Sequence, residues 1–163
     1  MRKELDEVLV AKYPTIFQNR HADPSKTCMY WGFDCGDGWY NIIEAMCSDI
    51  TNHIRNERFN IDLVNKWNTK LAEAEANNFE DWEEWKPREY REVPEPIQDV
   101  IAIQVKEKFG GLRFYYSGGD DYIRGIVSMA ECMSYRTCEV CGSPGTSNNE
   151  GWIRTLCEEH RKG

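Results

Sequence analysis

Two short cysteine motifs near the end of the 163-residue chain constrain its fold more than any other feature. Each motif holds two potential metal ligands separated by two residues, and fifteen residues lie between the motifs. This spacing is typical of zinc sites built from two ligand pairs. The alternatives are two unrelated pairs of buried thiols, or a redox Cys-x-x-Cys motif, against which the second pair argues. The sequence therefore predicts a zinc site with the ligands Cys138, Cys141, Cys157 and His160.

The residues around these ligands predict a treble-clef finger. Gly142 permits the left-handed turn that a zinc knuckle often needs. Residues 143–151 have the polar composition of a hairpin tip, and residues 152–156 are expected to form a short strand. Cys157 begins a last helical turn, on which Cys157 and His160 face the same way. Four protein ligands fill a tetrahedron, so the predicted Zn²⁺ is structural and its binding free energy contributes to folding.

Cysteine usage and charge narrow the class of protein. The chain has seven cysteines, an odd number, and residues 1–6 show no apolar segment typical of a signal peptide, which favours a cytoplasmic location. No apolar run is long enough to predict a membrane span. The net charge of −8, and a neutral balance over residues 136–163, argue against nucleic acid as a partner. The remaining cysteines are expected to be core or half-buried residues: Cys28, Cys35, Cys47 and Cys132.

The rest of the chain predicts an α+β fold. Apolar residues at steps of three and four predict helices over residues 3–13, 39–54, 61–76 and 120–135. The last of these has the expected buried stripe Ile123, Ile126, Val127, Ala130 and Met133. Period-two alternation predicts a β-hairpin near residues 100–117, with Ile101, Ile103 and Val105 on one face. We expect helices packed on this hairpin in a domain of residues 1–136, with the finger, residues 137–163, packed on it as an appendage.

Residues 73–95 form an acidic, tryptophan-containing segment with nine acidic and three basic residues. Its prolines favour a loop over a helix or strand. Such a segment is either a solvated loop or a surface for a basic partner. In the second interpretation Trp82, Trp85 and Tyr90 are the candidate anchors.

Two glycine-containing stretches, and one face of the hairpin's second strand, are candidate parts of a pocket for a small nucleotide-like ligand. Residues 118–121 lead into a helix N-terminus, which can bind phosphate, and residues 36–39 lead into another. Arginine and aromatic side chains can stack on a base. The alternative for each position is an ordinary cap, ion pair or core role. The candidate residues are Trp31, Asp37, Trp39, Arg113, Tyr115 and Asp120.

Three blocks resemble a small family of bacteriophage and bacterial proteins. They are residues 35–39 (CGDGW), residues 105–115 (VKEKFGGLRFY) and the C-terminal motif from Thr137, with Trp152 and Cys157. The family carries no established activity, so the resemblance implies a context, which is a phage or mobile-element protein acting in the bacterial cytoplasm. His160 stands where a fourth cysteine is more usual, and histidine ligates zinc equally well.

These observations favour a zinc-stabilised, non-enzymatic binding protein, such as a phage accessory or anti-defence protein that binds a host protein or a nucleotide-like ligand. A nucleic-acid-binding finger and an unrecognised hydrolase are the alternatives. A His-Asn-His nuclease would need a further catalytic histidine on the finger, where His160 is already a ligand. The chain has no P-loop, Rossmann glycine pattern or nucleophile elbow.

Overall fold

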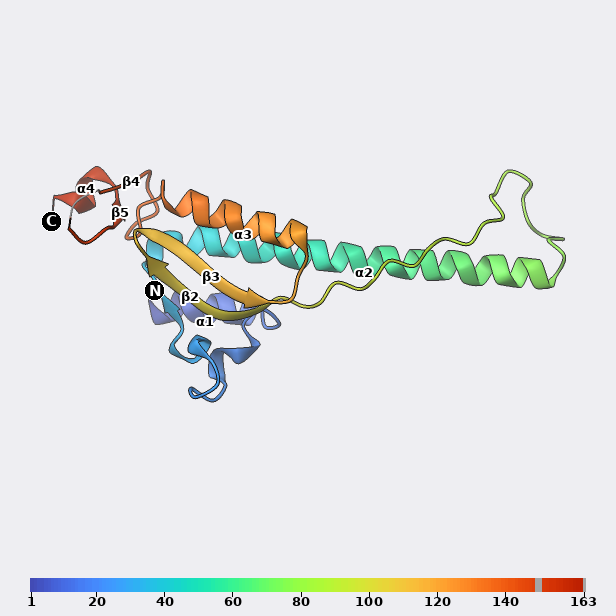
Figure 1. The fold of residues 1–163 in the computed structure, drawn as a ribbon, viewed down its shortest axis with the longest axis horizontal. Coiled ribbons are helices and arrows are strands. Elements are labelled where there is room, and N and C mark those ends of the chain that lie inside the picture. Colours follow the sequence, from blue (N-terminus) through green and yellow to red (C-terminus); the bar gives the residue numbers. More distant parts are fainter. Residues whose placement is uncertain (149–150, 163) are drawn as a thin grey trace. The chain divides into compact units, whose positions relative to one another are not determined.

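The structure is a computed structural model that describes residues 1–148 and 151–162. The chain divides into two compact units, one formed by Met1–Asn52 together with Gln98–Gly163 and the other by His53–Ile97. The mixture of helices with a small sheet confirms the predicted α+β class (Figure 1). The helices are α1 (Lys3–Lys12), α2 (Tyr40–Ala76), α3 (Asp121–Ser134) and α4 (Glu158–Arg161), with 3-10 turns η1 (Gln18–His21), η2 (Cys28–Trp31) and η3 (Asp37–Trp39). The strands are β1 (Phe33–Asp34), β2 (Ile101–Lys108), β3 (Gly111–Ser117), β4 (Thr146–Ser147) and β5 (Thr155–Leu156).

The predicted β-hairpin is confirmed as β2 and β3, which pair antiparallel. Phe109 and Gly110 form its two-residue turn, and both have positive φ angles, 54° and 78°. That combination matches the right-handed twist of the flanking strands. β1, which was not predicted, pairs parallel with β2 and completes a three-stranded sheet in the order β1-β2-β3.

The prediction of which β2 side chains share one face of the sheet is wrong in the first half of the strand. The pairing register shifts between Ala102 and Gln104, so a bulge interrupts the alternation. Ala102 and Val105 are buried, whereas Ile103 is exposed. The bulge turns Ile103 out of the face that it was expected to share with Val105.

The two helices predicted over residues 39–54 and 61–76 are one continuous helix, α2. The connecting residues 55–60 contain neither glycine nor proline, so nothing in them stops a helix. The boundary between the two compact units falls within α2, after Asn52.

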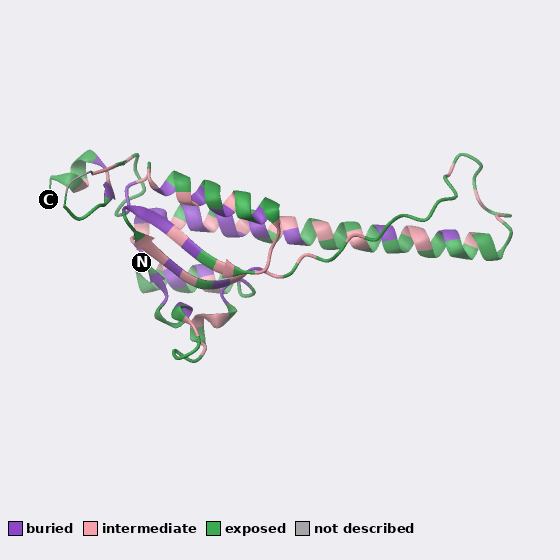
Figure 2. Cartoon of the chain, viewed as in Figure 1, coloured by how far each residue is buried: buried purple, intermediate pink, exposed green. Residues whose placement is uncertain are grey.

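The core of the first unit is built around Trp39, which is completely buried. Ile43 and Ile50 of α2, Leu112 of β3 and Ile123 of α3 are also fully buried. Figure 2 shows buried positions recurring along β2, β3 and the first part of α2. Packing of these side chains fixes the positions of α3 and the start of α2, which together line an apolar groove.

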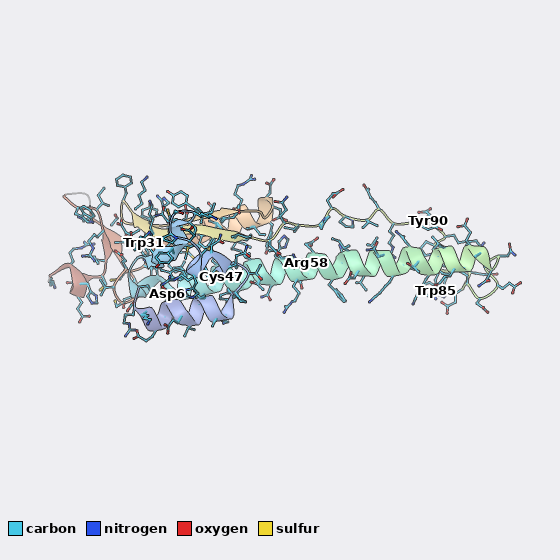
Figure 3. All side chains as sticks on the ribbon, turned by 90° about the horizontal axis from the view of Figure 1, so that it is seen from below. Asp6, Trp31, Cys47, Arg58, Trp85 and Tyr90 are labelled. Carbon is cyan, nitrogen blue, oxygen red and sulfur yellow. The ribbon has the colours of Figure 1, made fainter. Side chains whose placement is uncertain are left out.

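A largely buried ion pair fixes the N-terminal part of the first unit. The Arg20 guanidinium donates to both carboxylate oxygens of Asp6, with the Nη2–Oδ2 distance at 2.8 Å, and to the Tyr30 carbonyl at 2.6 Å (Figure 3 labels Asp6). Gly32 packs against this pair, because a Cβ there would lie 2.5 Å from an Asp6 oxygen. The pair therefore ties α1, η1 and η2 together.

The second unit consists of the later part of α2 and the acidic segment. Residues 77–97, all of which the structure describes, form turns and irregular chain, which confirms the predicted loop. The Arg91 guanidinium lies 4.3 Å from the centre of the Trp67 ring. Asn68 holds the Arg91 backbone with two hydrogen bonds of 2.8 Å.

None of the helices that the structure describes combines the length and apolar composition needed to cross a membrane.

Candidate metal centre and apolar groove

The four predicted metal ligands lie together. Their ligand atoms are all within 4.8 Å of one another, so the cluster could hold a metal ion. The Sγ atoms of Cys141 and Cys157 are 3.8 Å apart, and Cys138 Sγ lies 3.7 Å from His160 Nδ1. Zn–S bonds of about 2.3 Å in a tetrahedron give S···S edges of about 3.8 Å. The Cys141–Cys157 separation matches that edge, whereas Cys157 Sγ and His160 Nδ1 are closer, at 3.1 Å.

Local hydrogen bonds lower the pKa of two of the three cysteine thiols. Burial raises the pKa of Cys138, but hydrogen bonds from the backbone of Cys157, Cys141 and Val140 outweigh it and bring the pKa to about 7. Hydrogen bonds from Ser143 lower the pKa of Cys141. The pKa of Cys157 is raised: a backbone hydrogen bond at His160 lowers it, but burial and the neighbouring thiols outweigh this. Three thiolates at this spacing repel one another unless a cation sits between them.

The elements around the cluster follow the predicted order. Gly142 has a φ of 79°, which confirms its left-handed turn after Cys141. β4 and β5 pair antiparallel, and α4 follows Cys157 and carries His160. The predicted strand over residues 152–156 is shorter than expected, and part of the predicted hairpin tip, residues 149–150, lies outside the described residues.

The segment that begins at Thr137 and carries the candidate metal ligands, called the metal segment below, is joined to the core by hydrogen bonds to its backbone carbonyls. The Trp39 indole N–H donates to the Thr137 carbonyl at 2.9 Å, and the Gly38 N–H donates to the Glu139 carbonyl at 2.8 Å. A Cβ on Gly38 would lie 2.1 Å from the Cys138 carbonyl oxygen. Glycine is therefore required at position 38 for the two chain segments to approach this closely.

Two further contacts tie the segment to the sheet and to the loop before η3. The buried Thr155 hydroxyl donates to the Gly110 carbonyl at 2.6 Å. The Glu139 carboxylate accepts from the Gly36 N–H at 3.0 Å and lies 3.9 Å from Arg154. Burial raises the pKa of Glu139, against the lowering effect of these partners. Residues 36–39 of the CGDGW block thus hold the metal segment in place through these hydrogen bonds.

The six residues predicted to bind a nucleotide-like ligand each make contacts of their own with different parts of the chain. Trp39 lies in the core, and the Asp37 carboxylate pairs with Arg2 at 2.5 Å. The Asp120 carboxylate caps α3 by accepting from the Ile123 N–H at 3.0 Å. Trp31, labelled in Figure 3, is exposed. Its ring makes an edge contact with the ring of Tyr30.

The other two of these residues lie on β3. The Arg113 guanidinium donates to the Leu112 carbonyl and the Tyr135 hydroxyl, and lies 3.8 Å from the Glu131 carboxylate. Tyr115 is exposed, and its ring lies 5.6 Å from the Lys106 ammonium. Arg113 is therefore already bound to groups of its own chain.

The three candidate partner-binding residues differ in exposure. Trp82 is half-buried and makes an edge contact with Trp67 at 5.6 Å between ring centres. Trp85, labelled in Figure 3, is 77% exposed. The exposed Tyr90 hydroxyl donates a hydrogen bond of 2.9 Å to the Glu75 carboxylate. Trp82 thus holds the acidic segment on its own unit, while Trp85 faces solvent.

An apolar groove between α3 and the first part of α2 was not predicted. Its volume is about 640 Å³. Ile42 and Met46 of α2 and Ala130 of α3 are buried and form its floor. Ala45 and Gly125, which are small and exposed, line it from either helix.

The open side of the groove is formed by residues of α3, two of which were predicted to lie in the core. Met133 is 49% exposed and Ile126 is half-buried, so the predicted buried stripe of α3 is wrong at these two positions. Tyr122 and Met129, 56% and 64% exposed, continue the same line. α3 packs against β3, whereas its side chains along the groove stay partly exposed in the part of the chain that the structure describes. The signal was present in the sequence, because α3 carries more apolar residues than one buried stripe requires.

Comparisons of the chain with protein-family models, with curated proteins and with solved structures found no match.

Proposed function

We propose that this chain is a zinc-stabilised, non-enzymatic binding protein that holds a partner protein in the groove between α2 and α3. The observation that carries the proposal is the exposure of Tyr122, Met129 and Met133 beside an apolar floor. Contiguous exposed apolar surface on a folded protein marks an interaction site. The helices that form the groove are fixed by the core beneath them, so the surface is preorganised for binding.

Zinc is the proposed metal, bound in a treble-clef finger. Three cysteines and one histidine are ligands that favour Zn²⁺, and the S···S distance of 3.8 Å suits its tetrahedral geometry. Four protein ligands leave no position for water or substrate, so the metal stabilises the fold and takes no part in catalysis. Through Thr137 and Glu139 the finger braces the loop at residues 36–39, after which α2 begins. Thr155 joins the finger to the β2–β3 turn at Gly110.

A protein partner is favoured over a nucleotide. Arg113, Asp37 and Asp120, which would face a nucleotide, are each bound to groups of this chain. The groove offers apolar side chains in place of cationic ones. The resemblance to phage and bacterial proteins sets the context, in which the partner is a host protein in the bacterial cytoplasm.

The proposal is tested by affinity capture from a bacterial lysate with the wild-type chain and two variants. Met129→Glu places a charge in the groove, and Ser128→Glu places the same charge at the neighbouring exposed position outside it. We expect a partner that the wild type and Ser128→Glu retain and Met129→Glu loses. Equal capture by all three proteins, or capture of no protein, contradicts the proposal.

A further inference from the structure

The two ends of the groove differ in charge. α3 runs antiparallel to the first part of α2 (Figure 1), so Asp49 and Asp121 stand at one end and Asn41 and Met133 at the other. Among the described residues that line the groove, none is lysine or arginine. Asp121 pairs with Arg124 at 2.9 Å.

Asp49 is the unmatched charge at this end. It is exposed, and no ion pair joins it to another residue in the part of the chain that the structure describes. An exposed carboxylate beside apolar surface attracts a cationic group on a partner and repels an acidic one. The groove is thus apolar along its length and acidic at one end.

The apolar side chains of α3 are spaced as in helix–helix interfaces. Tyr122, Ile126, Met129 and Met133 follow one another at steps of four, three and four residues. This pattern forms a straight ridge that a helix lying in the groove can pack against. The 14 residues of α3 extend over about 21 Å, so the ridge offers roughly four turns of contact.

Small residues leave room for a third helix. A Cβ on Gly125 would meet nothing within 4 Å, so packing among the described residues does not require glycine there. Ala45 lines the opposite helix. Between them a partner side chain can reach the floor formed by Ile42 and Met46.

We infer that the groove takes an amphipathic α-helix of a partner protein, whose apolar face carries lysine or arginine at the end that meets Asp49. This inference rests on the proposed function and specifies its partner. The helix would lie against Ile126 and Met129, as in other helix-in-groove complexes.

A second copy of this chain is a poorer occupant. Its own groove face would bring Asp49 and Asp121 and no lysine or arginine. Each chain also carries a net charge of −8, so two copies repel one another at long range. A basic partner helix gains the electrostatic attraction that a second copy lacks.

The test uses two synthetic helical peptides of about 18 residues, a length that covers the ridge of α3. Both have the same leucine face at the spacing i, i+3, i+4, i+7, and one is flanked by lysine and arginine while the other is flanked by glutamate. Binding to the full zinc-loaded chain is measured by fluorescence anisotropy. We expect the basic peptide to bind at least about tenfold more tightly than the acidic one.

Two pairs of variants locate the binding. Met129→Glu should weaken the basic peptide by about tenfold or more, with Ser128→Glu as the matched control that leaves binding unchanged. Asp49→Lys should weaken it by roughly three- to tenfold. Asp62→Lys, which makes the same charge change at an exposed position of α2 outside the groove, should have a much smaller effect. Melting temperatures confirm that each variant is folded.

Equal affinity for the two peptides, no binding of either, or equal effects of Asp49→Lys and Asp62→Lys would overturn the inference. A dimer in analytical ultracentrifugation that Met129→Glu dissociates would overturn it in favour of a second copy. If lysate capture finds a groove-dependent partner while the basic peptide does not bind, the proposed function stands and only the helical partner fails. If neither experiment depends on the groove, both proposals fail.

Discussion

The indole N–H of Trp39 donates a hydrogen bond of 2.9 Å to the carbonyl oxygen of Thr137, 98 residues further along the chain. Thr137 directly precedes the candidate metal ligand Cys138, and Trp39 directly precedes α2. The ring of Trp39 is completely buried. One side chain thus connects the centre of the core with the first ligand of the metal cluster.

Replacing Trp39 by Phe should destabilise this connection. The Thr137 carbonyl loses its donor in a part-buried site, and the smaller phenyl ring leaves space in the core. We expect the free energy of unfolding to fall by about 1–3 kcal/mol. Chemical denaturation of the zinc-loaded protein measures it. A variant as stable as the wild type would show that this hydrogen bond does not anchor the metal segment.

Two glycine-to-alanine substitutions should act in opposite directions. Gly38→Ala brings a Cβ to 2.1 Å from the Cys138 carbonyl oxygen, so we expect a loss of about 3 kcal/mol or more, together with weaker metal binding. Gly125→Ala meets nothing within 4 Å in an exposed part of α3, so we expect a gain of up to about 1 kcal/mol from helix propensity.

Thermal unfolding of the two variants checks both expectations. Destabilisation by Gly125→Ala would mean that position 125 is packed against another part of the chain. An unchanged melting temperature for Gly38→Ala would contradict the close approach of residues 36–39 to the metal segment.

The seven cysteines should fall into three classes of reactivity toward an alkylating reagent. Cys28 and Cys132 are exposed and should react in the native protein, whereas burial protects Cys35 and raises its pKa to about 12. Burial likewise raises the pKa of Cys47. The metal ligands should react only after chelation: Cys138, Cys141 and Cys157.

Cys141 is the informative member of the third class because it is exposed. Exposure alone would let it react as fast as Cys28, and metal coordination would prevent this. Peptide mass spectrometry after alkylation, with and without a chelator, separates the two cases. Rapid alkylation of Cys141 without chelator would contradict a metal-bound thiolate.

Metal affinity should fall as the pH is lowered. The pKa of Cys138 is lowered from 9.0 to about 7 in the folded chain, because backbone hydrogen bonds to its thiolate outweigh burial. The stability that this shift contributes is present above the unfolded value and is lost as the pH falls through about 7. Protons then compete with the metal for the thiolate. Competition with a metal-binding dye across this range should show the decrease, and a constant affinity would contradict thiolate ligands.

The clustering of the four candidate metal ligands was predictable from sequence because the spacing of such motifs reflects coordination geometry. The β-hairpin was also predicted, since alternation over residues 100–117 and the glycines at 110 and 111 point to the same structure. In both cases the information lies within a short stretch of chain.

Features that depend on distant residues were missed. The bulge at Ile103 is a matter of register with β3, which alternation alone does not reveal. Cys28 and Cys132 were expected to be at least partly buried and are exposed, because neighbouring segments do not cover them.

The groove was missed because periodicity shows that a helix face is apolar without showing what covers it. Ile126 and Met133 were therefore assigned to the buried stripe of α3. The exposure of Tyr122 and Met129 becomes visible only once α2 is placed beside α3.

Native mass spectrometry of the purified chain, combined with thermal unfolding, tests the central claim most directly. We predict one Zn²⁺ per chain, held by Cys138, Cys141, Cys157 and His160, and its loss in the variant Cys157→Ser together with a clear drop in melting temperature. The exposed Cys132→Ser variant is the matched control and should keep both the metal and the melting temperature. A metal-free wild-type chain that melts at the same temperature with and without added Zn²⁺ would contradict the account.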